Sequence, residues 1–100
     1  MTTKYLTVKE LESELKTPIS FASSLKSERL SREMTRKEFS KLLGISIQSL
    51  ADIEHSRRIP SPERALKIAT QIGEPIAWWV QLSLQDHLRE KKIDLNVLVS

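Results

Sequence analysis

Residues 41–54 have the sequence KLLGISIQSLADIE. Shortly after its glycine, this stretch carries side chains that can hydrogen-bond to a polar partner. Gln48 offers an amide, and Asp52 offers a carboxylate about one helical turn later. If the chain after Gly44 is a helix whose apolar residues point inward, its exposed face consists of Ile47, Gln48, Ser49, Ala51 and Asp52. These side chains are short and mostly polar, which suits a helix that lies in a DNA major groove about 12 Å wide.

The exposed face divides into candidates for base contacts and candidates for phosphate contacts. Gln48 is the residue most suited to reading a base, because its amide can pair with both N6 and N7 of adenine. Ile47 can pack on a thymine methyl group, and Asp52 lies on the same face. Ser46 and Ser49, at the start of the helix, are better placed for phosphate oxygens. The alternative is that all five are ordinary surface residues of a helical bundle.

The elements that must position this face are almost all helical. Apolar residues recur at spacings of three and four, and only two glycines and four prolines occur. Capping boxes at 7–10 and 35–38 and capping serines at 46 and 61 each begin a helix, whereas Gly44 and Gly73 each end one. These signals predict helices that begin near residues 7, 20, 35, 46, 61 and 75, and the last reaches about residue 92. Residues 93–100 are left as a short strand or a frayed end.

Gly44 has a particular use in this arrangement. Glycine adopts positive φ without a Cβ clash, so it can reverse the chain just past a helix end. Two short helices joined by such a turn can cross steeply, which holds the second helix against the first and leaves its far face in solvent.

At this point the sequence resembles a known family. Residues 34–73, MTRKEFSKLLGISIQSLADIEHSRRIPSPERALKIATQIG, are similar to the helix-turn-helix domain of phage-repressor and Cro type regulators. The resemblance extends from Phe21 to about Val80. The matching positions are Phe39, Ser40 and Leu43 in the first helix, Gly44 and Ile45 in the turn, and Leu50 and Ile53 in the second helix.

The resemblance implies an all-α fold. We expect a five-helix repressor-like domain at residues 20–80, an extra N-terminal helical extension at 1–19, and the end of the last helix with a tail at 81–100. Such regulators bind double-stranded DNA at palindromic operators as two-fold homodimers. They insert the second helix of the motif into the major groove. The resemblance also implies that Arg29 and Glu54 form a partly buried ion pair that supports the fold.

Three arginines are implied to contact DNA phosphates. Arg36 occupies the place where many members carry a glutamine that binds a phosphate, and Arg57 and Arg58 lie in the loop after the second helix. Arg36 and Arg57, like Gln48, are expected to face solvent. Ser56 is a departure, because the family often has glycine there, so the exit of the helix is expected to differ in shape.

The last predicted helix carries its apolar residues on two faces. Trp78 and Leu82 share a face that is separate from the stripe of Ile76 and Val80. Tryptophan is enriched at the energetic centres of interfaces. We therefore expect a dimer or partner contact that consists of Trp78, Leu82, Leu95 and Val97. The alternative is that Trp78 packs under the N-terminal helix of its own chain.

Residues 77–85, AWWVQLSLQ, resemble the C-terminal signature of antitoxins from host-inhibition-of-growth toxin–antitoxin modules. That resemblance implies an autoregulating antitoxin that also binds a ribonuclease toxin. A stand-alone phage or plasmid repressor is equally compatible with the sequence.

Composition limits the other classes of function. One hundred residues suffice for one domain, and the absence of cysteine, together with the isolation of His55 and His87, predicts no metal and no cofactor. No long apolar run occurs, so we expect a cytoplasmic protein that does not contact a membrane. Residues 21–60 hold eight basic and five acidic residues, which accounts for the whole net charge of +3 and suits a polyanion. No catalytic constellation is present, so an enzyme is not expected; the alternative is a repressor-fold interaction module that does not bind DNA.

Overall fold

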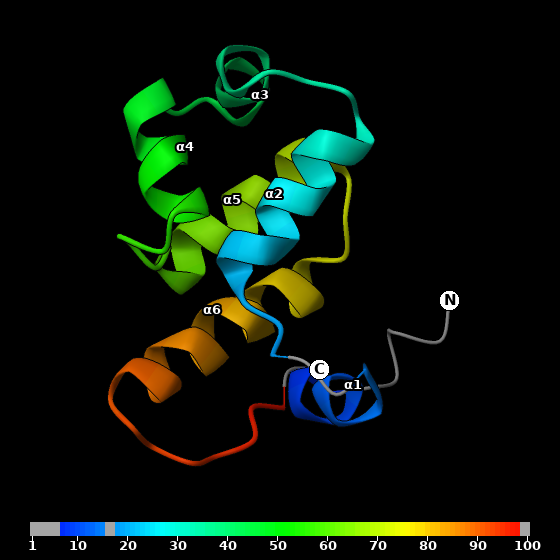
Figure 1. The fold of residues 1–100 in the computed structure, drawn as a ribbon, viewed down its shortest axis with the longest axis vertical. Coiled ribbons are helices and arrows are strands. Elements are labelled where there is room, and N and C mark those ends of the chain that lie inside the picture. Colours follow the sequence, from blue (N-terminus) through cyan, green and yellow to red (C-terminus); the bar gives the residue numbers. More distant parts are fainter. Residues whose placement is uncertain (1–6, 16–17, 99–100) are drawn as a thin grey trace.

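In the computed structural model, which describes residues 7–15 and 18–98, the chain folds into six α-helices (Figure 1). They are α1 (Val8–Leu15), α2 (Phe21–Ser31), α3 (Arg36–Leu43), α4 (Ile47–Glu54), α5 (Pro62–Ile72) and α6 (Ile76–Glu90). The described residues contain no strand, so the predicted all-helical class is confirmed. The last helix ends slightly earlier than predicted, and the tail is irregular as far as residue 98. None of the helices in the described ranges is long and apolar enough to span a membrane.

The helix starts follow the capping residues read from the sequence. The hydroxyl of Thr35 accepts a hydrogen bond from the N–H of Glu38 at 3.1 Å, and the Glu38 carboxylate accepts from the N–H of Thr35 at 2.9 Å. These two bonds form the predicted capping box. The bond from the Thr35 N–H, and next a bond that the Thr35 hydroxyl donates to Oε1 of Glu38 at 3.2 Å, lower the pKa of the Glu38 carboxyl. Ser46 and Ser61 cap α4 and α5 in a similar way, because each serine hydroxyl accepts a hydrogen bond from the backbone N–H three residues later. Local chemistry therefore fixes where α3, α4 and α5 begin.

The core is built from apolar side chains of every helix. Phe21, Phe39, Leu50, Ile68 and Leu82 are each at most 1% exposed. Among the helix pairs, α5 packs most extensively on α6, and α2 packs on α4. The ring of Phe21 meets that of Trp79 edge-on, with centroids 5.2 Å apart and an interplanar angle of 72°. The core thus joins the first helix of the repressor-like region to the last.

The N-terminal helix α1 packs on α6. Val8 is fully buried, and its N–H donates to Oε1 of Gln81. Farther along α1, Glu12 pairs with Arg89, and Lys9 pairs with Asp94 in the tail. Of the predicted extension 1–19, residues 7–15, 18 and 19 lie within the described ranges. This described part shares the core of the rest of the chain.

The prediction that Leu82 lies on a partner-binding surface is wrong. Leu82 is 0% exposed, and Trp79 is 2% exposed, so both belong to the core. The physical reason is that α6 is covered by α1, α2 and α5, so more than one of its faces is buried. The predicted boundary at residue 80 also falls inside this continuous helix.

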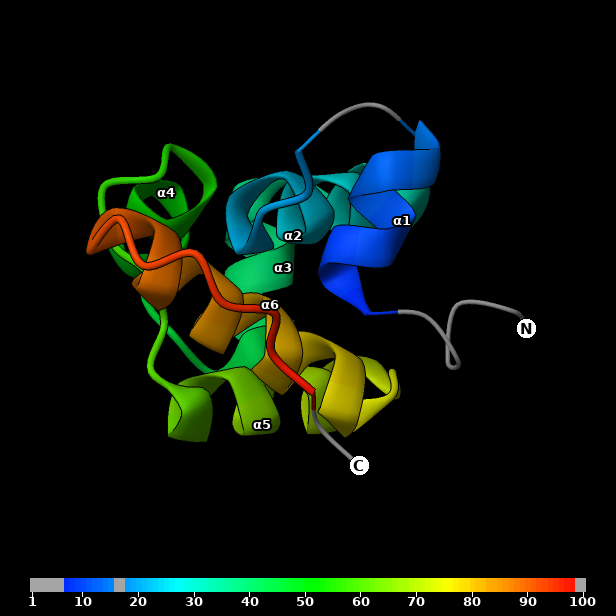
Figure 2. The same cartoon turned by 90° about the horizontal axis from the view of Figure 1, so that it is seen from below.

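Polar residues of α6 are buried as well, each with a partner. Ser83 donates its hydroxyl proton to the carbonyl of Pro60 at 2.7 Å. Gln85 is fully buried; its Nε2 donates to the carbonyl of Leu95 at 2.8 Å, and its Oε1 accepts from the N–H of Val97 at 3.1 Å. The tail therefore turns back along α6 (Figure 2). Because these polar residues are inside, an apolar stripe alone does not mark the buried side of this helix.

Candidate nucleic-acid interface

The turn between α3 and α4 depends on Gly44. Its φ is 72°, and its N–H donates to the carbonyl of Lys41 at 3.2 Å, while the N–H of Ile45 donates to the carbonyl of Ser40 at 3.1 Å. A Cβ added at Gly44 would meet nothing within 4 Å. The glycine is therefore required by the left-handed backbone rather than by lack of space.

Helix α4 directs one face to the core and another to solvent. Leu50 is 0% exposed and Ile53 is 1% exposed, whereas Ile47 is 48% exposed. Gln48 is also exposed, and Asp52 is half-buried. The helix lies on the side of the molecule away from α1 (Figure 1, Figure 2). Ile47 and Gln48 are thus the most accessible of the residues predicted to read bases.

The two serines at the start of α4 bind each other. The Ser46 hydroxyl oxygen accepts from the N–H of Ser49 at 3.0 Å, and its proton is donated to the hydroxyl oxygen of Ser49 at 3.0 Å. The hydroxyl proton of Ser49 is left to donate elsewhere. Their contact with phosphate stays a prediction, and of the two Ser49 has the better-placed donor.

Gln48, Asp52 and Arg57 form a chain of hydrogen bonds across the exposed side of α4. Oδ1 of Asp52 accepts from Nε2 of Gln48 at 2.9 Å and from Nε of Arg57 at 2.9 Å. The bond from Arg57, and next the bond from Gln48, lower the pKa of Asp52 below its ordinary value. The chain joins a predicted base-reading residue to a predicted phosphate-binding residue.

The loop after α4 is anchored on the same aspartate. The N–H groups of Arg57 and Arg58 donate to the backbone carbonyl of Asp52 at 2.8 and 3.2 Å. Ser56 has a φ of 60°, in the left-handed region that favours glycine. The helix exit therefore uses a glycine-like conformation although the residue is serine. Both loop arginines are exposed, as predicted phosphate contacts require.

The carboxylate of Glu54, at the end of α4, binds Arg29 of α2. Its Oε2 accepts from Nε of Arg29 at 2.8 Å, and its Oε1 accepts from Nη2 at 3.1 Å. Arg29 is 9% exposed and Glu54 is 8% exposed. The pair implied by the family resemblance is therefore present and buried. Because a buried charge is costly without its partner, this pair ties the end of α4 to α2.

Arg36 also belongs to this ion-pair network. Its Nε donates to Oε1 of Glu54 at 3.0 Å, and its Nη2 lies 3.5 Å from Nε2 of His55. The Arg36 side chain is only 35% exposed. The expectation that Arg36 simply faces solvent is therefore wrong, because the start of α3 lies beside the end of α4. A phosphate contact from its remaining donors stays a prediction.

The residues predicted to form a partner contact lie in different environments. Trp78 is half-buried and, with Leu11 of α1 and residues of α2, lines a groove of about 610 Å³. Leu95 is 59% exposed, and Val97 is half-buried against Gln85. Because Leu82 lies in the core, the residues of the predicted contact that are at least partly accessible are Trp78, Leu95 and Val97.

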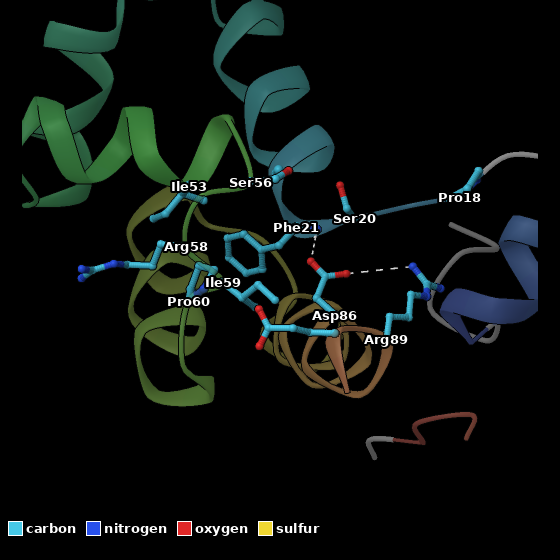
Figure 3. A pocket seen from close by; sticks show the side chains of 12 residues that line it. Pro18, Ser20, Phe21, Ile53, Ser56, Arg58, Ile59, Pro60, Asp86 and Arg89 are labelled. Carbon is cyan, nitrogen blue, oxygen red and sulfur yellow. Dashed lines mark hydrogen bonds and ion pairs between the residues drawn. The ribbon is translucent and has the colours of Figure 1, made fainter. Parts of the chain in front are cut away.

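A second hollow, of about 380 Å³, lies behind the loop that follows α4 (Figure 3). Phe21 and Pro60 form apolar parts of its lining, and Asp86 accepts a hydrogen bond from the N–H of Phe21 at 2.9 Å. Burial raises the pKa of Asp86, although that bond opposes the rise. Arg58 extends away from Phe21 and Asp86 (Figure 3), so its charged end lies exposed on the outer side of the loop.

A family model described as helix-turn-helix matches residues 25–79, which is more than half of the chain. The match includes α3, the turn at Gly44 and α4. The chain belongs to the helix-turn-helix family. This helix-turn-helix protein is a DNA-binding regulator, and α4 is the second helix of its motif. Comparisons with curated proteins and with solved structures gave no match.

Several contacts of the interface were not predicted from the sequence, and they differ in whether the sequence carried a signal for them. The bond between Gln48 and Asp52 had a signal, since glutamine and aspartate four residues apart on a helix commonly bond. The bond between Arg36 and Glu54 had none, because it joins two helices across a turn.

Proposed function

We propose that this helix-turn-helix protein represses transcription by binding a near-palindromic operator as a two-fold dimer, and that it acts by binding rather than by catalysis. The observation that best supports the proposal is the orientation of α4. Leu50 and Ile53 hold this helix on the core, and Ile47 and Gln48 are directed to solvent. A helix that is packed on the core by one face and exposed on the other meets the geometric requirement for entering a major groove.

In this proposal the residues of the interface have separate tasks. Gln48 reads adenine, and Ile47 packs on a thymine methyl group. The exposed Arg57 and Arg58, consecutive residues of the loop after α4, bind phosphates beside the groove, which adds affinity without sequence preference. The backbone of both arginines is held close to α4 by the carbonyl of Asp52. Phosphate binding would therefore fix the position of α4 along the DNA groove.

We place the two-fold contact on the C-terminal tail. Among the tail residues, Ile93 is 44% exposed, Leu95 is 59% exposed and Leu98 is 77% exposed. Neighbouring exposed apolar side chains of this kind favour association. A second copy bound there must set the two α4 helices about 34 Å apart, so that they meet successive major grooves.

The test is selection of binding sites from random duplexes, followed by mobility shift over a range of salt. We expect an enriched near-palindrome and an affinity that falls steeply as salt rises. Sedimentation at micromolar protein should show a dimer, either alone or on the selected duplex. Failure to enrich any sequence would contradict the proposal and favour the alternative of an interaction module. A protein that sediments as a monomer, both alone and with the selected duplex, would contradict the proposed dimer.

We further propose that the regulator is the antitoxin of its own operon, which rests on the resemblance of residues 77–85. Trp79 and Leu82 in this block are buried, which leaves the half-buried Trp78 to contact a ribonuclease toxin. The test is co-expression with any small reading frame beside its gene. Relief of growth arrest that is lost in Trp78→Ala, while operator binding persists, supports the role. No rescue by the wild type contradicts it.

A further inference from the structure

Asp52 restricts how the amide of Gln48 can be oriented. A carboxylate has no proton to donate, so only the amino group of the glutamine can face it. The structure has this arrangement, with Nε2 of Gln48 donating to Oδ1 of Asp52 at 2.9 Å. The same oxygen accepts from Nε of Arg57 at 2.9 Å, so the carboxylate is bonded to the loop after α4 as well.

This bond changes the set of groups that Gln48 can present to a base. A glutamine amide carries two N–H donors on Nε2 and one acceptor, Oε1. With one N–H given to Asp52, one donor and one acceptor are left. In the major groove adenine offers one acceptor, N7, and one donor, the N6 amino group, whereas guanine offers two acceptors, N7 and O6. The groups left on Gln48 match adenine, and binding both acceptors of guanine would need the N–H that Asp52 holds.

We propose that Asp52 is a positioning residue that determines specificity. Asp52 does not touch the base; it orients the amide of Gln48 so that Gln48 selects adenine over guanine. The inference rests on the proposed function, since it requires that Gln48 reads a base. It also changes the expected role of Asp52 from a base contact to an intramolecular one. Because Arg57 shares the carboxylate, the same residue aligns the reading side chain with the phosphate-binding loop.

The experiment uses the duplex selected by the wild-type protein and a copy in which one A·T pair per half-site is changed to G·C. The altered pair is the one at which Gln48→Ala loses its base preference. Binding to both duplexes is measured for the wild type, Asp52→Ala, Gln48→Ala and the double variant. We expect the wild type to prefer adenine by about tenfold or more, and Asp52→Ala to lose most of that preference. The double variant should show the same base preference as Gln48→Ala, because Asp52 acts on that preference only through the glutamine.

Two further variants make the outcome decisive. Arg57→Ala removes the other partner of Asp52 and should weaken binding to both duplexes alike, so the adenine preference should be kept. Asp52→Asn keeps the shape of the side chain but can donate to Oε1 of Gln48, so it should relax the preference even if Asp52→Ala is poorly folded. Circular dichroism on each variant reports whether it is folded.

The results separate the inference from the proposed function. If Gln48→Ala loses the base preference while both Asp52 variants keep it, the inference is overturned and the reading role of Gln48 stands. The same holds if the effects of Asp52→Ala and Gln48→Ala on that preference simply add. If the wild type shows no preference among duplexes at all, both the proposed function and this inference are contradicted.

Discussion

Helices α4 and α6 differ in how well the apolar or polar type of a residue predicts whether it is buried. In α4 the apolar Leu50 and Ile53 are buried, and the polar Gln48 is exposed. In α6 Gln85 and Ser83 are fully buried, while Ile76 is 43% exposed. The difference follows from the neighbours of each helix. One side of α4 is left free for a partner, whereas α6 is covered by three helices and the tail.

The comparison teaches where function can be located on this molecule. A helix with one buried face can present the other face to DNA, and changes on that face should alter binding but not folding. A helix that is enclosed contributes mainly to stability. The variants below test this division, from the largest expected effect to the smallest.

Glu54→Ala should give the largest loss of stability. It would leave the buried guanidinium of Arg29 without its carboxylate, a change that costs about 3–5 kcal/mol when one partner of a buried pair is removed. Urea unfolding followed by circular dichroism measures the free energy of unfolding. The exposed Glu14 is the matched control, and Glu14→Ala should change stability by less than about 0.5 kcal/mol. Equal effects at the two positions would mean that the ion pair does not support α4.

Leu82→Ala should destabilise the fold by about 2–5 kcal/mol, because it removes a fully buried side chain from the core. Leu95→Ala, in the exposed tail, should change the free energy of unfolding by less than about 0.5 kcal/mol and should weaken the dimer in sedimentation. The reverse result, a stable Leu82→Ala protein that no longer dimerises, would restore the surface role that the sequence predicted for this residue.

Gln85→Ala tests the polar interior of α6. The change removes both hydrogen bonds that Gln85 makes to the tail and should cost about 1–3 kcal/mol, since the carbonyl of Leu95 and the N–H of Val97 lose this partner. Amide hydrogen exchange at Val97 should accelerate, while exchange in α4 should follow only the global stability. Unchanged exchange at Val97 would show that the tail is held in some other way.

Arg36→Ala should have a small effect on stability, about 1 kcal/mol or less, because its side chain is partly exposed and Arg29 still pairs with Glu54. If its remaining donors contact a phosphate, the salt dependence of DNA binding should also fall by about one unit per protomer. Mobility shift at several salt concentrations measures the slope. The neighbouring exposed Lys37 gives the control variant for loss of one charge on α3. A change of base preference in Arg36→Ala would contradict this assignment.

Much of the fold can be predicted from short-range chemistry. The capping of α3 by Thr35, the cap of α4 by Ser46 and the left-handed Gly44 are set by residues a few positions apart. The candidate reading face follows from these, since the buried Leu50 and Ile53 decide which side of α4 is free.

The remaining features depend on contacts between distant residues. Leu82 is buried because α6 is covered from several sides, one of them by α1, where the N–H of Val8 bonds to Gln81. The second partner of Glu54, Arg36, is likewise supplied by another helix. Helical periodicity describes one helix at a time, so it cannot show how many sides are covered or which charges meet.

The central claim is that α4 reads DNA through Gln48. The most direct measurement compares wild type and Gln48→Ala on the selected operator and on an unrelated duplex of equal length. We expect Gln48→Ala to lose about 1–3 kcal/mol of binding free energy on the operator, with relaxed preference at one base pair in each half-site. Binding to the unrelated duplex and the free energy of unfolding should stay close to wild type, because Gln48 is exposed. Equal loss on both duplexes, or an unfolded variant, would contradict the claim.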